Sequence, residues 1–129
     1  MKGSEEIAKE VVDAAFQVHQ QLGPRLLESA YEICLYHELT TRNLKVERQL
    51  QLPIIYKNIK LDAGYRLDLI VEDCIIIEIK AVEKMEPIHN AQLLTYLKLS
   101  KKSLGFLINF NTDYFKGSIK RVVNNYQKT

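Results

Sequence analysis

Hydrophobic and polar residues alternate most regularly between Tyr65 and Lys80, where Val, Ile and Leu dominate and no Gly or Pro interrupts. Alternation of this kind is typical of β-strands. We predict two strands here, joined by a tight turn at Glu72 and Asp73. The run of three isoleucines at positions 75–77 indicates that the second strand is buried on both faces.

A period of two assigns each side chain in these strands to one face of a sheet. In the second strand, Glu78 and Lys80 share a face with Cys74 and Ile76. One face of the first strand is expected to carry Arg66, Asp68, Ile70 and Glu72. The opposite face is expected to carry Leu67, Leu69 and Val71. We therefore expect the acidic side chains of the two strands to reach one shared pocket.

Glu78 and Lys80 are charged residues in a strand that the isoleucine run predicts to be buried. A buried charge is costly unless it is paired or bound to a metal. Asp68 and Glu78 offer hard oxygen ligands, which suit Mg²⁺ or Mn²⁺. Lys80, one pleat from Glu78, is suited to hold or deprotonate an attacking water and to offset charge on a phosphorane. Two carboxylates and one lysine on adjacent strands are therefore the set that metal-assisted cleavage of a phosphodiester bond needs.

Helical periodicity governs the N-terminal part of the chain. Residues 4–22 carry one apolar stripe, with Ser4 as the expected N-terminal cap and a Gly-Pro pair as the stop. A second helix is predicted over about residues 26–41. On this helix Glu28 and Tyr31 lie on one face because they are three residues apart.

Strand-like alternation returns over residues 45–55. The next four residues, Tyr56–Ile59, predict a hairpin turn in which Asn58 tolerates a left-handed backbone. A further strand follows through Leu61 and Ala63, just before the central segment.

The C-terminal half begins with a helix predicted over about residues 88–99, with Pro87 in its first turn. Gln92 and Tyr96 lie one turn apart on one side of this helix. Residues 104–110 predict a further buried strand. A last helix is expected to carry an apolar side made of Phe115, Ile119, Val122 and Tyr126. This order of elements predicts an α/β domain in which one mixed sheet is flanked by helices on both faces.

Composition is ordinary for a globular protein, and the net charge is only +2. A chain of this length predicts a single domain over residues 1–129. The small net charge gives no evidence for nucleic-acid binding, which would require a local basic surface. Cys34 and Cys74 fit neither a disulfide framework nor zinc spacing. With no signal sequence and no long apolar run, we expect a cytoplasmic protein without membrane contact.

The spacing of Asp68, Glu78 and Lys80 resembles the active-site motif of the PD-(D/E)xK nuclease superfamily. The wider chain, from about residue 7 to residue 123, resembles one branch of it, the GxxExxY proteins. The resemblance includes the segments LGPRLLESAY at residues 22–31 and QLLTY at residues 92–96. The Asp…Glu-x-Lys pattern alone has little specificity. The upstream Glu and the downstream Gln-x-x-x-Tyr, in this order, make the assignment more specific.

The resemblance implies a restriction-endonuclease-like core with a metal site. Asp68 and Glu78 would bind Mg²⁺ or Mn²⁺, and the main-chain carbonyl of Ile79 would be a further ligand. Lys80 would position water and stabilise negative charge.

The resemblance also implies roles for three residues on the predicted helices. Glu28 would reach the metal directly or through water. We interpret Tyr31 as a packing residue whose hydroxyl orients Glu28. Without the resemblance, Glu28 is a helix-start carboxylate favoured by the helix dipole. Gln92 would hold Lys80 or a phosphate oxygen, and Tyr96 would pack or hydrogen-bond near the substrate.

Two arginines lie close to these motifs. Arg25 stands where the first Gly of the GxxExxY motif would fall. If that Gly serves a positive φ angle, Arg25 must adopt a conformation that is costly for arginine. Alternatively, Arg25 contacts phosphate near the mouth of the site. Arg66 is suited either to contact phosphate or to pair with Asp68.

Three interpretations remain open. The first is a Mg²⁺-dependent nuclease that hydrolyses phosphodiester bonds in DNA, with RNA as the alternative substrate. The second is a catalytically silent module of the same fold that binds nucleic acid or a protein partner. The third is structural, with Glu78 paired to Lys80 and Asp68 to Arg66. So small a domain offers little surface to a long duplex, which favours a homodimer or a larger protein partner.

Overall fold

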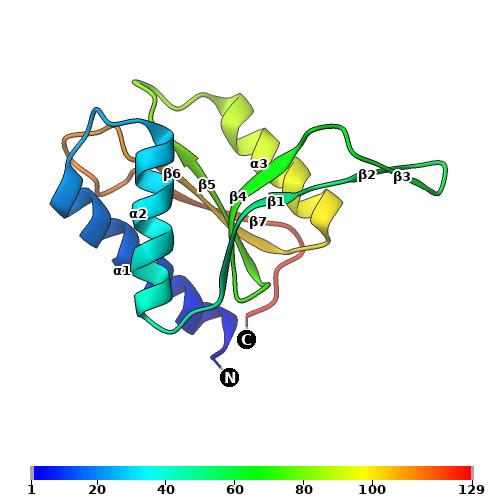
Figure 1. Cartoon of the computed structure of the whole chain (residues 1–129), viewed down its shortest axis with the longest axis horizontal. Helices are drawn as coiled ribbons and strands as arrows, with labels where there is room; N and C mark the ends of the chain where they lie inside the picture. The colour runs from blue at the N-terminus through cyan, green and yellow to red at the C-terminus, as the bar shows by residue number, and fades with distance from the viewer. Residues whose placement is uncertain (1, 129) are drawn as a thin grey trace.

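The computed structural model describes residues 2–128, which form three helices, a five-stranded sheet and a separate two-stranded hairpin (Figure 1). The helices are α1 Ser4–Leu22, α2 Glu28–Thr41 and α3 Pro87–Ser100. The strands are β1 Val46–Gln51, β2 Ile54–Tyr56, β3 Ile59–Leu61, β4 Arg66–Val71, β5 Ile75–Lys80, β6 Leu104–Asn109 and β7 Ile119–Val123.

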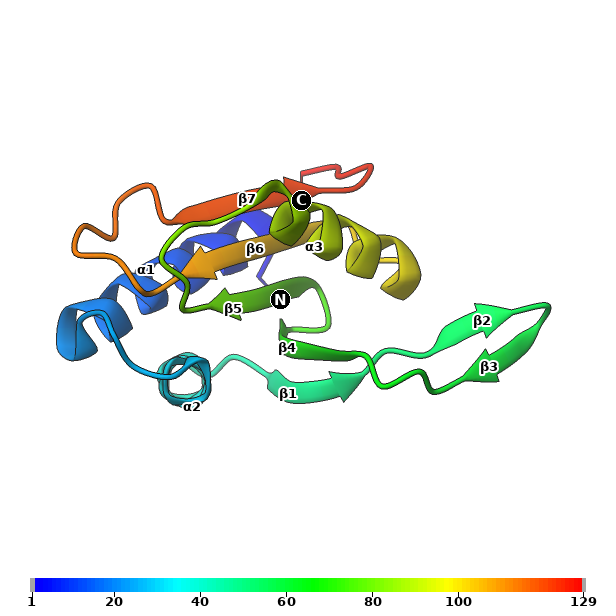
Figure 2. The ribbon, with the colours of Figure 1, turned by 90° about the horizontal axis from the view of Figure 1, so that it is seen from above.

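The main sheet is mixed, with the strand order β1-β4-β5-β6-β7 (Figure 2). β5 and β6 are parallel and are joined through α3, whereas the other neighbouring pairs are antiparallel. A parallel pair needs a crossover connection of this kind, since its second strand must start at the same end as the first. The predicted α/β class with one mixed sheet is confirmed.

Each face of the sheet packs against its own helices (Figure 1). One core cluster joins α1 and α2 to the sheet and includes Leu35 and Ile77; we call this the α1–α2 face. The other joins α3 to the sheet and includes Leu93 and Ile76; we call this the α3 face. Neighbouring isoleucines of β5 thus bury opposite sides, as the isoleucine run predicts. Burying each such side chain contributes roughly 1.5–3 kcal/mol.

The three predicted helices of the N-terminal part and of residues 88–99 are present, and two of them have ends that differ from the prediction. α1 begins and ends as predicted, α2 begins at Glu28, and α3 extends one residue further at each end than predicted. Ser4 is the first residue of α1 and not its cap, because Gly3 occupies the cap position. The Ser4 hydroxyl lies 2.6 Å from the hydroxyl of Tyr126.

The side chains of β4 do not alternate regularly. Leu69 and Val71 pack on the α1–α2 face, whereas Leu67 packs on the α3 face. The prediction that all three share one face is therefore wrong. The alternation of side chains between the two faces is interrupted at Asp68, which lies between Leu67 and Leu69.

In β1, the alternation of side chains between the two faces of the sheet is interrupted at the position opposite Asp68. Val46 packs on the α1–α2 face, and Leu50 packs against the α3 face. Gln49 lies between Arg48 and Leu50 and has a φ angle of 51°, a left-handed conformation that is rare in a strand. Because the pairs on either side of it set Gln49 opposite Asp68, both strands twist at the same place.

The predicted C-terminal helix is wrong, since Ile119–Val123 forms β7 and pairs antiparallel with β6. The apolar spacing that suggested a helix has two separate origins. Phe115 packs on the α1–α2 face from a loop, and Val122 packs on the α3 face from the strand. As a strand, this segment satisfies the backbone groups at the edge of β6.

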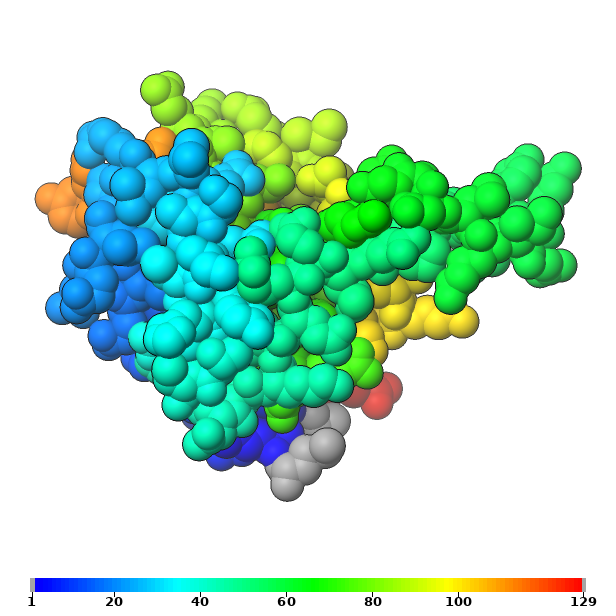
Figure 3. All heavy atoms as spheres, in the orientation of Figure 1, coloured from blue at the N-terminus to red at the C-terminus, as the bar shows by residue number. Residues whose placement is uncertain are grey.

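The strand predicted over residues 45–55 is divided in two. β1 stops at Gln51, and β2 and β3 form a separate hairpin, residues 54–61, that we call the arm. Lys57 and Asn58 have φ angles of 50° and 66°, which confirms the predicted turn. The arm projects away from the body of the molecule (Figure 3), and no arm residue belongs to either core cluster.

No helix in the part of the chain that the structure describes is long and apolar enough to span a membrane.

The arm gives a first test of this packing. Replacing residues 54–61 by Asn-Gly should change the free energy of unfolding by less than about 1 kcal/mol, since the arm lies outside both clusters. By contrast, Leu35→Ala in the core should cost about 2–5 kcal/mol. Urea unfolding measures both values. A loss from arm removal as large as that of Leu35→Ala would contradict the core as described.

Candidate functional site

Strands β4 and β5 separate at Asp68 and Glu78. Their backbones pair only from Leu69, opposite Ile77, to the turn. Beyond that point the two carboxylates replace the ladder. Glu78 Oε2 accepts the Asp68 N–H at 3.0 Å, and Asp68 Oδ2 accepts the Ile79 N–H at 2.7 Å. Both acids therefore lie in one gap between the strands, as the sequence predicts.

The gap disfavours negative charge. Glu78 is only 5% exposed, and burial raises its pKa from 4.5 to about 8, with the Asp68 charge adding to the effect. Burial also raises the pKa of Asp68, and the negative charges of Glu32 and Glu28 raise it further. The Lys80 charge acts in the opposite direction on the pKa of both acids. Lys80 therefore offsets part of the effect that burial and the neighbouring carboxylates have on the pKa values of Asp68 and Glu78.

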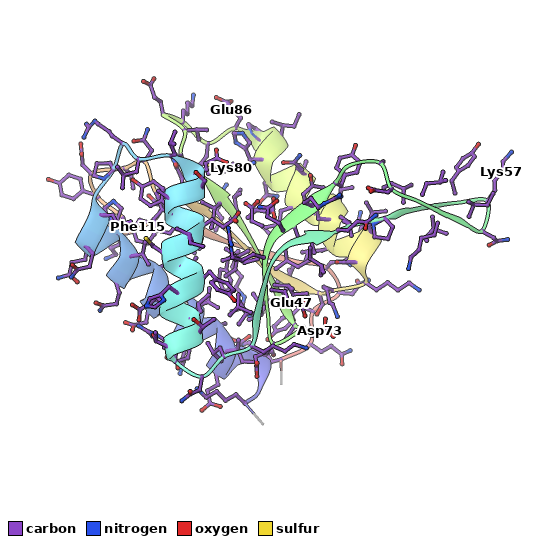
Figure 4. The ribbon with its side chains drawn as sticks, in the orientation of Figure 1. Glu47, Lys57, Asp73, Lys80, Glu86 and Phe115 are labelled. Carbon is purple, nitrogen blue, oxygen red and sulfur yellow. The ribbon has the colours of Figure 1, made fainter. Side chains whose placement is uncertain are left out.

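Lys80 ends β5, beside the beginning of α2 (Figure 4). Its carbonyl accepts the Phe110 N–H at 3.0 Å, which fixes the backbone to the chain after β6. Within residues 2–128, no carboxylate lies within 4 Å of the Lys80 ammonium group. The ion pair between Glu78 and Lys80 in the structural interpretation is therefore not formed.

Glu28 opens α2 and reaches the end of β5. Its Oε2 accepts the Ala81 N–H at 3.4 Å, next to Lys80 in the chain. Tyr31 does not orient Glu28, contrary to expectation. The Tyr31 hydroxyl donates to the Gly23 carbonyl at 2.6 Å and accepts the Leu26 N–H at 3.2 Å. Tyr31 therefore holds the loop that leads into α2.

Tyr96 brings α3 to the gap. It is buried, and its pKa is raised first by burial and then by the charges of Glu78, Tyr65 and Asp68. The Tyr96 and Tyr65 rings meet edge to face, 6.0 Å apart. Gln92 lies one turn earlier on α3 and is exposed, and none of the described residues hydrogen-bonds its side chain. Tyr96 thus lies near both acids, whereas Gln92 does not contact Lys80.

Arg66 lies outside the gap. Its guanidinium pairs with Asp62 at 3.3 Å and donates to the Tyr65 carbonyl at 2.9 Å. The ion pair between Arg66 and Asp68 in the structural interpretation is therefore not formed either.

Arg25 has a φ angle of 74°, in the left-handed region. Its N–H donates to Asn111 Oδ1 at 3.1 Å, and its exposed guanidinium lies 3.7 Å from Asp113. The position that carries Gly in the GxxExxY motif thus has a backbone conformation that suits Gly.

Three residues that sequence analysis missed complete the surroundings of Asp68. Glu32 on α2 is only 7% exposed. It accepts hydrogen bonds from Gln49 Nε2 at 2.7 Å and Arg48 Nη2 at 3.3 Å. Gln49 Nε2 also lies 3.4 Å from Asp68 Oδ1. The available signal was that Glu32 follows Glu28 by one helical turn, which places both acids on one side of α2.

The residues in the gap fit a hard divalent cation. Within residues 2–128, no three carboxylate, imidazole or thiol side chains lie close enough to hold one ion. Two carboxylates are sufficient for Mg²⁺, which keeps several of its waters and prefers oxygen ligands. A cation between Asp68 and Glu78 would also offset the burial and the neighbouring negative charges that raise the pKa of each acid.

Burial of Glu78 predicts how stability depends on pH without metal. Because its folded pKa of about 8 lies above the ordinary 4.5, the folded state holds the proton more tightly. This contribution is complete below about pH 4.5 and is lost as the pH rises through 8. The free energy of unfolding should fall over this range, by at most about 1.4 kcal/mol per pH unit per proton. Urea unfolding in EDTA should show a smaller fall for Glu78→Gln, and equal profiles would contradict this account.

The backbone at Arg25 predicts a stabilising substitution. Arg25→Gly should raise the free energy of unfolding by about 0.5–1 kcal/mol, because Gly adopts positive φ without a steric penalty. The lost ion pair with Asp113 is exposed on both sides and contributes little. Arg25→Ala is the control, since it loses the same ion pair and keeps the strain. Equal thermal midpoints for the two variants would count against strain at this position.

Comparison with known proteins adds an independent finding to this geometry. A family model described as the PD-(D/E)XK nuclease superfamily matches residues 5–122. The searches of curated proteins and of solved structures return no match. The mixed five-stranded sheet flanked by helices agrees with the restriction-endonuclease-like fold of this superfamily. The chain belongs to the PD-(D/E)XK nuclease superfamily.

Proposed function

We propose that this protein is a metal-dependent nuclease that hydrolyses phosphodiester bonds in DNA. The observation that carries the proposal is the strand gap, in which Asp68 and Glu78 each hydrogen-bond the other strand's backbone. We further propose that the chain belongs to the GxxExxY branch, on the segments 22–31 and 92–96. The positive φ of Arg25 at the motif's Gly position supports this assignment.

Asp68, Glu78 and the main-chain carbonyl of Ile79 would hold Mg²⁺ or Mn²⁺. The N–H and C=O of one strand residue point toward the same neighbouring strand. Since the Ile79 N–H contacts Asp68, the Ile79 carbonyl also faces the gap. When bound, the cation supplies charge for the phosphoryl oxygens and lowers the pKa of a water.

Lys80 would hold the attacking water and stabilise negative charge on the phosphoryl group. Its ammonium group has no carboxylate within 4 Å in the described part of the chain, so it keeps donors for these contacts. Glu28 would assist by accepting a hydrogen bond from the water. Its position beside the Ala81 N–H, one residue after Lys80, supports this role.

Gln92, Tyr96, Arg25 and Arg66 would contact the substrate. Gln92 is exposed and would orient Lys80 or a phosphate oxygen, while the Tyr96 hydroxyl already lies in the field of both acids. The exposed ion pair of Arg25 with Asp113 is weak, so phosphate would compete for the guanidinium.

The setting of the enzyme is also a proposal. Residues 1–129 would act as one domain in the cytoplasm, where the free thiols of Cys34 and Cys74 would stay reduced. The small surface beside the gap favours a homodimer or a larger protein partner on duplex DNA.

Substitution of Asp68 tests the enzyme directly. Asp68→Asn keeps the shape and removes a charged ligand, so Mn²⁺-dependent cleavage should fall at least about 100-fold. Lys80→Ala should lose about 100-fold or more, because the attacking water loses its positioning cation. Initial rates on plasmid DNA, single-stranded DNA and RNA measure these effects.

Matched controls come from the same region. Asp62→Asn, an exposed aspartate paired with Arg66, and Lys84→Ala should keep the parent rate. Asp68→Asn as active as the parent would overturn the assignment. Calorimetric metal binding by the parent, without cleavage of any of the three substrates, would favour the catalytically silent module.

A further inference from the structure

We propose that Gln49 is a positioning residue that ties Asp68 to the buried Glu32 and presets the Asp68 carboxylate for a divalent cation. The inference rests on the proposed metal site. It assigns a role to a strand residue outside the sequence motifs, and that role comes from its contacts and its backbone.

The backbone of Gln49 is strained at the point where the site is built. Its φ angle of 51° lies in the left-handed region, although it is neither Gly nor Asn and sits within a strand. Residues persist in such conformations only where the surroundings over-determine them, and they cluster at functional sites. The register sets Gln49 opposite Asp68, where both strands change faces.

The side chain explains why glutamine occupies this position. The Gln49 amide nitrogen carries two hydrogens and lies between two carboxylates. It donates to Glu32 Oε1 at 2.7 Å and to Asp68 Oδ1 at 3.4 Å. Asp68 Oδ2 is already held by the Ile79 N–H at 2.7 Å. Both oxygens of Asp68 therefore have a donor, and the direction of the carboxylate is fixed.

Glu32 anchors the chain of contacts on α2. It is 7% exposed, and Arg48 Nη2 lies 3.3 Å from its second oxygen, Oε2. The Arg48 guanidinium in turn lies over the Tyr36 ring, 5.6 Å from its centre. Glu32 is thus a buried carboxylate already paired with Arg48, and it accepts the Gln49 amide through its other oxygen. The Gln49 amide therefore links the Asp68 carboxylate to Glu32 on α2.

Metal affinity distinguishes positioning from a merely structural role. Partners that orient metal ligands typically contribute about 10–100-fold in affinity. Gln49→Gly relieves the backbone strain and removes the amide, so stability should be unchanged or higher while Ca²⁺ and Mn²⁺ affinities fall about 10-fold or more. Gln49→Asn tolerates the left-handed backbone but is one methylene too short to span both acids, and its affinity should fall similarly.

Calorimetric titration with Ca²⁺ and with Mn²⁺ tests this prediction, with thermal melting in EDTA as the stability readout. Gln51→Ala is the matched control, since Gln51 is an exposed glutamine two residues further along the same strand. It should bind both ions as the parent does. If the parent binds metal and both Gln49 variants bind it equally well, the inference is overturned and the proposed function stands. If the parent binds neither ion, the proposed metal site fails, and the inference fails with it.

Discussion

The structure depends on two hydrogen bonds by which the side chains of Asp68 and Glu78 join strands β4 and β5. Where a sheet would continue its backbone ladder, Asp68 and Glu78 each reach across and accept a backbone N–H of the other strand. The strands stay connected, but two acids now occupy a buried gap. β4 and β5 contribute residues to both core clusters, and burial is the largest cause of the raised pKa values of both acids. Burial thus makes the ionised forms of both acids costly, and a bound cation would offset that cost.

The surrounding elements serve this gap from three directions. α2 contributes Glu28 at its first turn and Glu32 one turn later. β1 contributes Gln49, held in a left-handed conformation opposite Asp68, and α3 contributes Tyr96. Beyond Gln49 and Asp68, β1 and β4 stay paired with each other through Leu50 and Leu67, and the chain between them forms the arm.

Local patterns were sufficient to predict most of the fold. Helical periodicity located α1 and α3, and alternation located β4 and β5 with the turn at Glu72 and Asp73, both at positive φ. The meeting of Asp68 and Glu78 also followed from alternation, because strands joined by a tight turn must be neighbours. These features depend on residues close in sequence, so the sequence contains their signal.

Features that depend on distant contacts were missed. Leu67 left its predicted face because β4 twists where the ladder is broken, which period-two alternation does not register. β7 was predicted as a helix because its strand character comes from pairing with β6. The helical spacing from Glu28 was the one local signal for Glu32, and Gln49 gave none, since the importance of both lies in contacts between α2, β1 and β4. The roles of such residues outside the motif can be inferred only once the fold is known.

Anomalous diffraction from crystals grown with Mn²⁺ tests the central claim most directly. The account predicts one strong peak in the gap, bounded by an oxygen of Asp68, an oxygen of Glu78 and the Ile79 carbonyl. It also predicts that Gln49 still bridges Glu32 and Asp68 when the ion is bound. A gap without a peak at saturating Mn²⁺, with both carboxylates still bonded to the opposite backbone, would contradict it.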